Sequence, residues 1–343
     1  MRHEWIDAIK GYGIILVVAT HSNLFQGLPT ALLYLTAGYI AMFFIVSGYT
    51  TKAETFNKGV RQKACRLLLP YFFYGTILTL FRLIFECLPH SFVNKLEWAG
   101  LAYSRYSLYP LGTENNTQLL SGKSTAPLWF LTAMFVAYIW FYAYSRLKTT
   151  TQKAACVITL FIATAATAHL EILLPWSIDT SFICAIFIII GYELKEYIVK
   201  SNITLSGKTI VAMLALCVVY IVTTRFNGLP NLSVREYGNF HYTSIALMCI
   251  LSTTGTILVT QFFKAVNNTF ITKSLAFIGR HSLRIMCIHM PIVSLSTKYI
   301  WGGNHYAHAF QFLIAFGATL LLSMLLELIY TRLSKRYKLV KYL

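Results

Sequence analysis

The sequence is poor in charged residues, and in acidic residues most of all. Only 12% of its 343 residues are charged, with 12 Asp and Glu against 29 Lys and Arg. Soluble domains contain about 25% charged residues, so this composition argues against a soluble protein. The 57% hydrophobic content and the mean hydropathy of +0.60 indicate an integral membrane protein instead.

Several functional motifs are also missing. The seven cysteines form no C-x-x-C pair, which argues against a disulfide framework or a zinc site, and we interpret them as small buried hydrophobic residues. His305 and His308 have no carboxylate close by, so we expect no metal there. The sequence contains no G-x-S-x-G elbow, phosphate-binding loop or dinucleotide fingerprint, which leaves hydrolase and nucleotide-motor interpretations without support.

The net charge of +17 would suggest a nucleic-acid partner in a soluble protein. Here the Lys and Arg residues lie in short segments between apolar runs, where the enrichment of cytoplasmic loops in basic residues explains them. We therefore expect no nucleic-acid partner. The same residues are expected to contact membrane lipids.

About ten apolar runs approach the 20 or so residues that a membrane-spanning helix needs. They cover residues 8–24, 31–50, 67–88, 127–144, 154–170, 178–197, 210–224, 244–263, 275–295 and 309–330. If the N-terminus is cytoplasmic, most Lys and Arg residues fall on the cytoplasmic side, and both termini then lie there. We expect an all-α bundle of about ten transmembrane helices that forms a single domain over residues 1–343, with the polar connection 89–125 outside.

The first run carries ionisable residues near both of its ends. Asp7 and Lys10 lie at its start and His21 near its end. Lys10 and His21 are about three helical turns apart, so they share a face but are separated by about 16 Å along the axis. Ionisable residues at such depth in a membrane indicate a functional site by default. A histidine that only bonds a neighbouring helix is an equally weighted alternative.

A basic segment precedes the third run. It contains Lys52, Lys58, Arg61, Lys63 and Arg66. Membrane topology and anionic lipid headgroups explain such a segment. The alternative is a site for a phosphorylated ligand, because Arg and Lys suit phosphate oxygens.

A second basic cluster lies in the ninth run, within the sequence IGRHSLRIMCIHMPI. Arg280 and Arg284 are four residues apart and share a helix face, and His281 and His289 align roughly in the same way. Together with the basic segment, this face would form a cationic pocket. Alternatively, the arginines extend to the membrane surface, which suits Arg280 better than Arg284. Glu327, near a helix end, is expected to face water or to pair with Lys.

Six short motifs follow one another along the chain. They are Asp7, Lys10 and Gly11 with His21; Phe43, Phe44, Ser47 and Gly48; a basic stretch ending in Pro70 and Tyr71; Pro127, Trp129, Phe130 and Leu131; Phe187, Gly191 and Tyr192; and Gly279, Ser282, Leu283, Ile285, His289 and Pro291. In this order they resemble the acyltransferase-3 family of polytopic membrane acyltransferases, and most closely its branch that acetylates sugars of surface glycans. One departure is Lys10, where many members have Arg, because Lys cannot form a bidentate fork.

The resemblance implies that an acyl group, commonly acetyl, moves from coenzyme A to a hydroxyl of a surface-polysaccharide sugar or its lipid-linked precursor. Acetyl-CoA would be the donor, and no metal is implied. His21 would act as the catalytic base or as a transient acyl carrier. Asp7 and Lys10 are assigned to positioning of the donor.

The resemblance also implies that coenzyme A binds from the cytoplasmic side. The cations expected to hold its phosphates are Arg61, Lys63, Arg66, Arg280 and Arg284.

Three further residues are assigned to the acceptor site: Trp129, Tyr71 and His289. The two aromatic residues have an alternative interpretation as ordinary membrane-interface aromatics.

Two other functions remain open. One is a transporter or flippase of an envelope glycan or acyl group, although no pair of matching broken spans of the kind that inverted repeats produce is present. The other is a scaffold in an envelope-assembly complex. In each case we expect a multi-pass protein of the plasma membrane, the inner membrane of a bacterium.

Overall fold

The computed structural model describes residues 3–26, 28–29, 33–52, 54–85, 128–169, 174–200, 207–232, 236–239, 241–299 and 305–334. In these ranges the chain forms helices and no β-strand, with one isolated bridge between Asn231 and Glu236. The predicted all-α class is therefore confirmed. The polar connection 89–125 lies outside the described residues.

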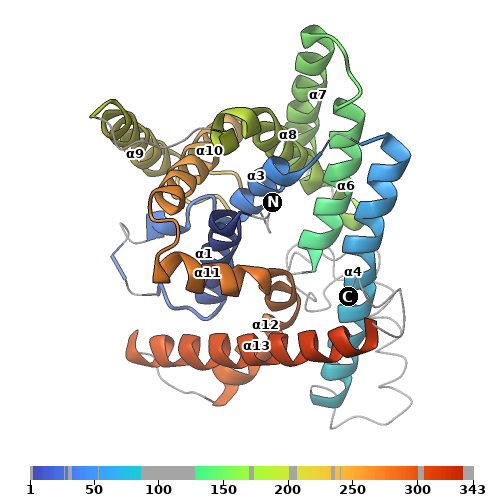
Figure 1. The fold of residues 1–343 in the computed structure, drawn as a ribbon, viewed down its shortest axis with the longest axis vertical. Helices are drawn as coiled ribbons and strands as arrows, with labels where there is room; N and C mark the ends of the chain where they lie inside the picture. The colour runs from blue at the N-terminus through green and yellow to red at the C-terminus, as the bar shows by residue number, and fades with distance from the viewer. Residues whose placement is uncertain are drawn as a thin grey trace.

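The helices follow one another along the chain with short connections in the described parts. They are α1 (Glu4–His21), η1 (Tyr34–Thr36), α3 (Tyr39–Thr50), α4 (Phe56–Phe85), α6 (Trp129–Tyr144), α7 (Thr150–His169), η2 (Pro175–Ser177), α8 (Ile178–Lys200), α9 (Gly207–Asn227), α10 (His241–Ala265), α11 (Phe270–Arg280), α12 (Ser282–Tyr299) and α13 (His305–Ser334). Figure 1 shows α1 and α3 near the centre, α9 and α4 at opposite sides, and α13 across the bottom.

Five helices of the described part are long and apolar enough to cross a membrane. They are Thr150–His169, Pro175–Ile198, Ile210–Asn227, Thr243–Ala265 and Tyr306–Arg332. Three shorter apolar helices accompany them: Tyr39–Thr50, Trp129–Tyr144 and Ser282–Thr297. These helices support an integral membrane protein, whereas the count of about ten spans and the cytoplasmic termini stay predictions.

Two helix boundaries differ from those that hydropathy predicts. Helix α4 begins at Phe56, so the basic segment apart from Lys52 belongs to the helix instead of forming a surface connection. The Lys, Arg, Gln and Ala residues of this segment favour helix. A hydropathy criterion leaves the charged and polar ones out of a predicted membrane span, so it places the start of the helix too late. The predicted run 275–295 is two helices that meet at His281, because α11 ends at Arg280 and α12 begins at Ser282.

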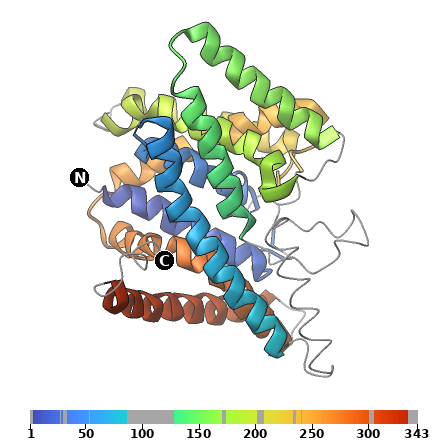
Figure 2. The same ribbon diagram turned by 90° about the vertical axis from the view of Figure 1, so that its right-hand side faces the viewer.

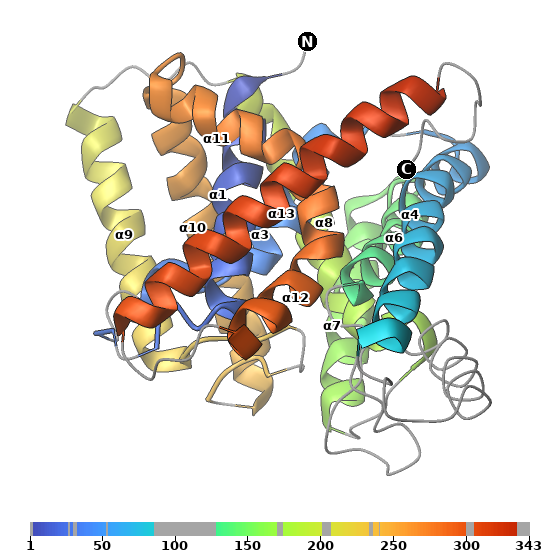
Figure 3. The ribbon, with the colours of Figure 1, turned by 90° about the horizontal axis from the view of Figure 1, so that it is seen from below.

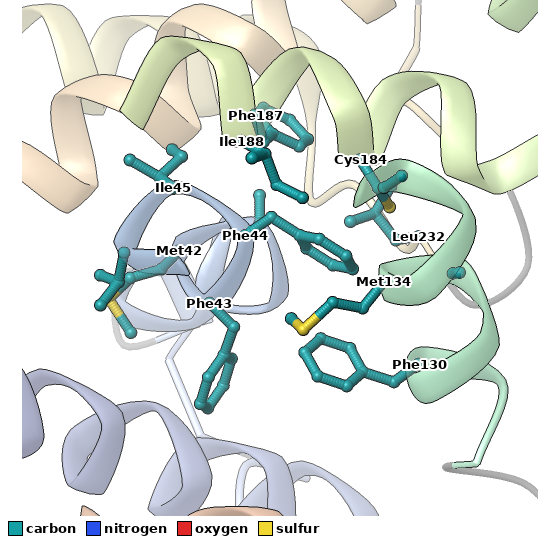
Figure 4. Close-up of a cluster of buried hydrophobic side chains, with 14 of the residues drawn as sticks. Met42, Phe43, Phe44, Ile45, Phe130, Met134, Cys184, Phe187, Ile188 and Leu232 are labelled. Atoms are coloured by element: carbon teal, nitrogen blue, oxygen red, sulfur yellow. The ribbon is translucent and has the colours of Figure 1, made fainter. Parts of the chain in front are cut away.

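The hydrophobic core lies among α3, α6 and α8, and α8 packs against both of the other helices (Figure 4). The ring of Phe130 packs against Phe44 with centroids 4.9 Å apart and against Phe43 at 5.8 Å. On the opposite side, a Cβ atom on Gly191 would collide with the carbonyl oxygen of Ile45, and one on Gly48 with a carbonyl of α8. These two motif glycines therefore permit the close approach of α3 and α8.

Helix α4 connects this core to α13. It runs diagonally along one side of the molecule and reaches α13 (Figure 2). There the hydroxyl of Tyr330 lies 3.5 Å from that of Tyr74. Pro70 lies inside the helix.

Candidate active site

The structure brings together two histidines from distant parts of the sequence. His21 is the last residue of α1, and His289 lies in the middle of α12. Their ring centroids are 5.2 Å apart, with the ring planes inclined by 44°. His289 is completely buried, whereas His21 is exposed. His21 is therefore the more accessible member of the pair.

The hydrogen bonds of His289 determine its tautomer. Its Nδ1 atom lies 3.0 Å from the carbonyl oxygens of both Ile285 and Met286. Carbonyl oxygens only accept, so we assign the hydrogen to Nδ1. An isolated buried charge is costly, so we take the ring as neutral, which leaves a lone pair on Nε2. This buried Nε2 atom has no hydrogen-bond partner among the described residues.

Asp7 and Lys10 lie at the other end of α1 from His21. The Nζ atom of Lys10 is 3.6 Å from Oδ1 of Asp7, and the Asp7 side chain is only 6% exposed against 32% for Lys10. The ammonium is therefore paired locally. About 16 Å of helix separates it from His21, so neither residue can touch the histidine pair directly.

A close crossing with α11 holds this end of α1. A Cβ atom on Gly11 would collide with the carbonyl oxygen of Leu275, and one on Gly279 would collide with the carbonyl oxygen of Asp7. The Cβ atom on Gly279 would also lie only 2.8 Å from the Gly11 nitrogen, so it is crowded by a second backbone atom of α1. Two glycines from opposite ends of the sequence thus set the spacing of α1 and α11 (Figure 3).

The link between α12 and α13 depends on Glu327, a residue that sequence reasoning placed in water or beside a Lys. Its Oε2 atom lies 3.2 Å from Nδ1 of His281 and 3.5 Å from Nη1 of Arg284. The same Nδ1 atom is 3.1 Å from the hydroxyl of Ser323. Glu327 is 48% exposed, as the expectation of a water-facing side chain requires, but its partners are His281 and Arg284 instead of a Lys. The charge of Arg284 is partly neutralised by this contact.

Lys63 also has a partner. Its ammonium lies 3.6 Å from the centroid of the Tyr138 ring, a cation–π contact. The Tyr138 hydroxyl is 3.0 Å from that of Thr51, whose carbonyl oxygen accepts a hydrogen bond from Lys195. Lys63 thus belongs to a cluster that joins α4, α6 and the end of α3.

The other three cations assigned to the donor are exposed: Arg61, Arg66 and Arg280. Arg280 stacks over the ring of Phe277, 5.6 Å from its centroid. All three side chains are exposed to an anionic ligand, Arg280 despite its ring contact, whereas Lys63 and Arg284 are only partly exposed.

The two aromatic residues assigned to the acceptor lie in the core. Tyr71 is completely buried in α4, and Trp129, the first residue of α6, is 6% exposed. Both belong to the hydrophobic cluster around α3. Their role in acceptor binding stays a prediction, as does that of His289, which lies beside His21.

The apolar helices and the pairing of exposed His21 with buried His289 define an integral membrane protein with a candidate catalytic site. A family model described as an acyltransferase domain, Acyl_transf_3, matches residues 3–328. The chain therefore belongs to the acyltransferase-3 family, and this membership supports a membrane acyltransferase over a transporter or a scaffold. Neither a curated protein nor a solved structure matches the chain.

Proposed function

We propose that this membrane acyltransferase moves an acetyl group from acetyl-CoA to a hydroxyl of a surface-polysaccharide sugar or its lipid-linked precursor. The membrane is the plasma membrane, that of a bacterial cell. Family membership supports acyl transfer, and the sequence resemblance supports the sugar branch. The observation that carries the chemistry is the buried Nε2 of His289, which has no hydrogen-bond partner in the described part of the chain and lies beside the exposed ring of His21.

The reaction needs a base for the acceptor hydroxyl. In the proposal, a ring nitrogen of His21 takes the hydroxyl proton while the oxygen bonds to the thioester carbonyl carbon. The carbon–sulfur bond then breaks, and the proton passes from His21 to the sulfur, so that coenzyme A leaves as a thiol. In the alternative form, His21 first carries the acetyl group and the hydroxyl then attacks it.

His289 acts on His21 as a positioning residue. With hydrogen on its own Nδ1, its Nε2 atom can accept a hydrogen bond from one ring nitrogen of His21. The other His21 nitrogen then carries the lone pair that receives the proton. This is the general arrangement in which a second group fixes the tautomer and orientation of a catalytic base.

The exposed cations provide the donor contacts. Arg61 and Arg66 on α4 and Arg280 at the end of α11 would bind phosphates of coenzyme A, since guanidinium groups form two parallel hydrogen bonds with phosphate. Lys63 and Arg284 contribute only if they leave Tyr138 and Glu327.

The test uses the purified chain in lipid nanodiscs with radiolabelled acetyl-CoA and a glycan acceptor extract. We expect His21→Ala to abolish label transfer. His169→Ala is the matched control, because His169 is also exposed at the last position of its helix. Full transfer by a folded His21→Ala protein would overturn the proposal. Label on the protein when no acceptor is present would favour the acyl-carrier form over the base form.

A further inference from the structure

A cavity that neither His21 nor His289 lines lies between α1, α3, α9 and α10. Its volume is about 450 Å³, within the range of about 300–1,000 Å³ that is usual for ligand sites. Residues that line it include Tyr12, Met42, Cys217, Ile221, Leu258 and Val259. The lining carries no ionisable carboxylate, Lys, Arg or His among the described residues, so it suits neither coenzyme A nor a charged sugar.

The position of the cavity along the helices places it deep in the membrane. Cys217 is in the middle of α9 (Gly207–Asn227), and Ser252 is in the middle of α10 (His241–Ala265). At 1.5 Å per residue, Cys217 is about 15 Å from either end of α9, and Ser252 is about 17 and 20 Å from the two ends of α10. That is the midplane of a hydrocarbon layer about 30 Å thick, where the surrounding medium is lipid chains.

The cavity opens sideways along α9. Ile221 lines it and is nevertheless 52% exposed. The outer face of α9 is also apolar and exposed, with Leu214 at 61% and Val218 at 60%. Figures 1 and 3 both show α9 at the edge of the bundle beside α10. A lipid chain in the bilayer can therefore enter without crossing a polar surface.

We propose that this cavity binds one acyl chain of a bilayer phospholipid. An apolar cavity left empty would deprive its walls of dispersion contacts, and a chain restores them. Phospholipid is the solvent around α9, so mass action favours it over any scarcer lipid.

The proposal also gives the bound acyl chain a structural role. The hydroxyl of Tyr220 on α9 donates to the carbonyl oxygens of Tyr34 and Ala37, both of which lie in the cavity wall. The bound chain fills the space that this contact encloses, and it packs α9 against α3 and the catalytic helix α1. The inference does not depend on the transfer reaction.

One polar atom distinguishes a hydrocarbon from a polar ligand. Ser252 is 1% exposed, lines the cavity, and its hydroxyl has no hydrogen-bond partner among the described residues. A ligand with a carbonyl at this depth would accept a bond from this hydroxyl, whereas an acyl chain has no such group there. Ser252→Ala should therefore leave lipid binding unchanged.

The experiment measures the lipid that stays bound to the purified protein after extensive washing in mild detergent, by mass spectrometry of the extracted lipids. We expect about one phospholipid per chain, lost when Cys217→Trp fills the cavity. Val218→Trp is the matched control, because the neighbouring residue faces outward, and it should retain the lipid. Val259→Phe fills the cavity from α10 and replaces Cys217→Trp if that protein does not fold.

Three results would overturn the proposal. They are equal phospholipid retention in the cavity-filling variants and the wild type, retention of an isoprenoid lipid in place of phospholipid, and loss of the lipid in Ser252→Ala. Acetyl transfer is measured in parallel. If the protein retains its phospholipid but transfers no acetyl group, that result contradicts the proposed function and leaves the lipid proposal intact.

Discussion

The crossing of α1 and α11 gives a prediction whose sign depends on the packing seen in the structure. Gly279 lies inside α11, and helix propensity alone makes Gly→Ala stabilising by about 1 kcal/mol. The crossing acts in the opposite direction, because a Cβ atom there collides with the carbonyl of Asp7 and lies 2.8 Å from the Gly11 nitrogen. Both are backbone atoms, which cannot rotate away as a side chain can.

The magnitude follows from these two opposing terms. Overpacking costs about 1–3 kcal/mol, and contact with two backbone atoms places this site at the upper end. After subtracting the propensity gain of about 1 kcal/mol, we expect Gly279→Ala to destabilise the protein by about 2 kcal/mol. Because α1 carries His21, the shift of the helices should also lower acetyl transfer.

Gly317 provides a control of opposite sign. It lies inside α13, and apart from the nearby backbone of its own helix no described atom is within 4 Å of its Cβ position. Gly317→Ala should therefore stabilise by about 1 kcal/mol. Tryptophan fluorescence during thermal unfolding in detergent measures both variants. A melting temperature of Gly279→Ala at or above that of the wild type would refute the tight crossing.

Three other substitutions test separate parts of the site. His289→Ala should lower kcat for acetyl transfer while the KM for acetyl-CoA stays the same, and an unchanged kcat would contradict its positioning role. Arg61→Gln should raise the KM for acetyl-CoA, with exposed Lys148→Gln as the control, and equal KM values in both would favour lipid contacts instead. Glu327→Gln should lower the free energy of unfolding by about 1 kcal/mol, because the carboxylate is 48% exposed and exposed ion pairs contribute little. An unchanged melting temperature would show that the contact of Glu327 with Arg284 adds no measurable stability.

Composition and hydropathy were sufficient for the fold class but not for the helix ends. The low charge and the apolar runs predicted membrane helices, and the described helices confirm the all-α class. The break at His281 was missed, because its ring is held by Ser323 and Glu327 from another helix. Contacts between distant segments leave no local pattern in a sequence, so the pairing of Arg284 with Glu327 was missed for the same reason.

The candidate site was predicted as a set of residues, without their arrangement. His21 and His289 both appeared among the motif residues, but nothing local indicated that their rings lie 5.2 Å apart. Lys63 was assigned to the donor because basic residues cluster there. Its contact with Tyr138 depends on how α4 packs against α6, which spacing along α4 alone cannot show.

The arrangement divides the motif residues into those that can do chemistry and those that set distances between helices. Gly11 with Gly279, and Gly48 with Gly191, allow two pairs of helices to approach at backbone distance. The close approaches explain these glycines by helix packing alone, without any role in catalysis. Loss of activity in a motif variant is therefore weak evidence for catalysis unless thermal stability is measured too. Among the described motif residues, His21 is exposed and lies beside a buried nitrogen, Nε2 of His289, for which the described part of the chain offers no hydrogen-bond partner. This combination supports the proposed transfer chemistry.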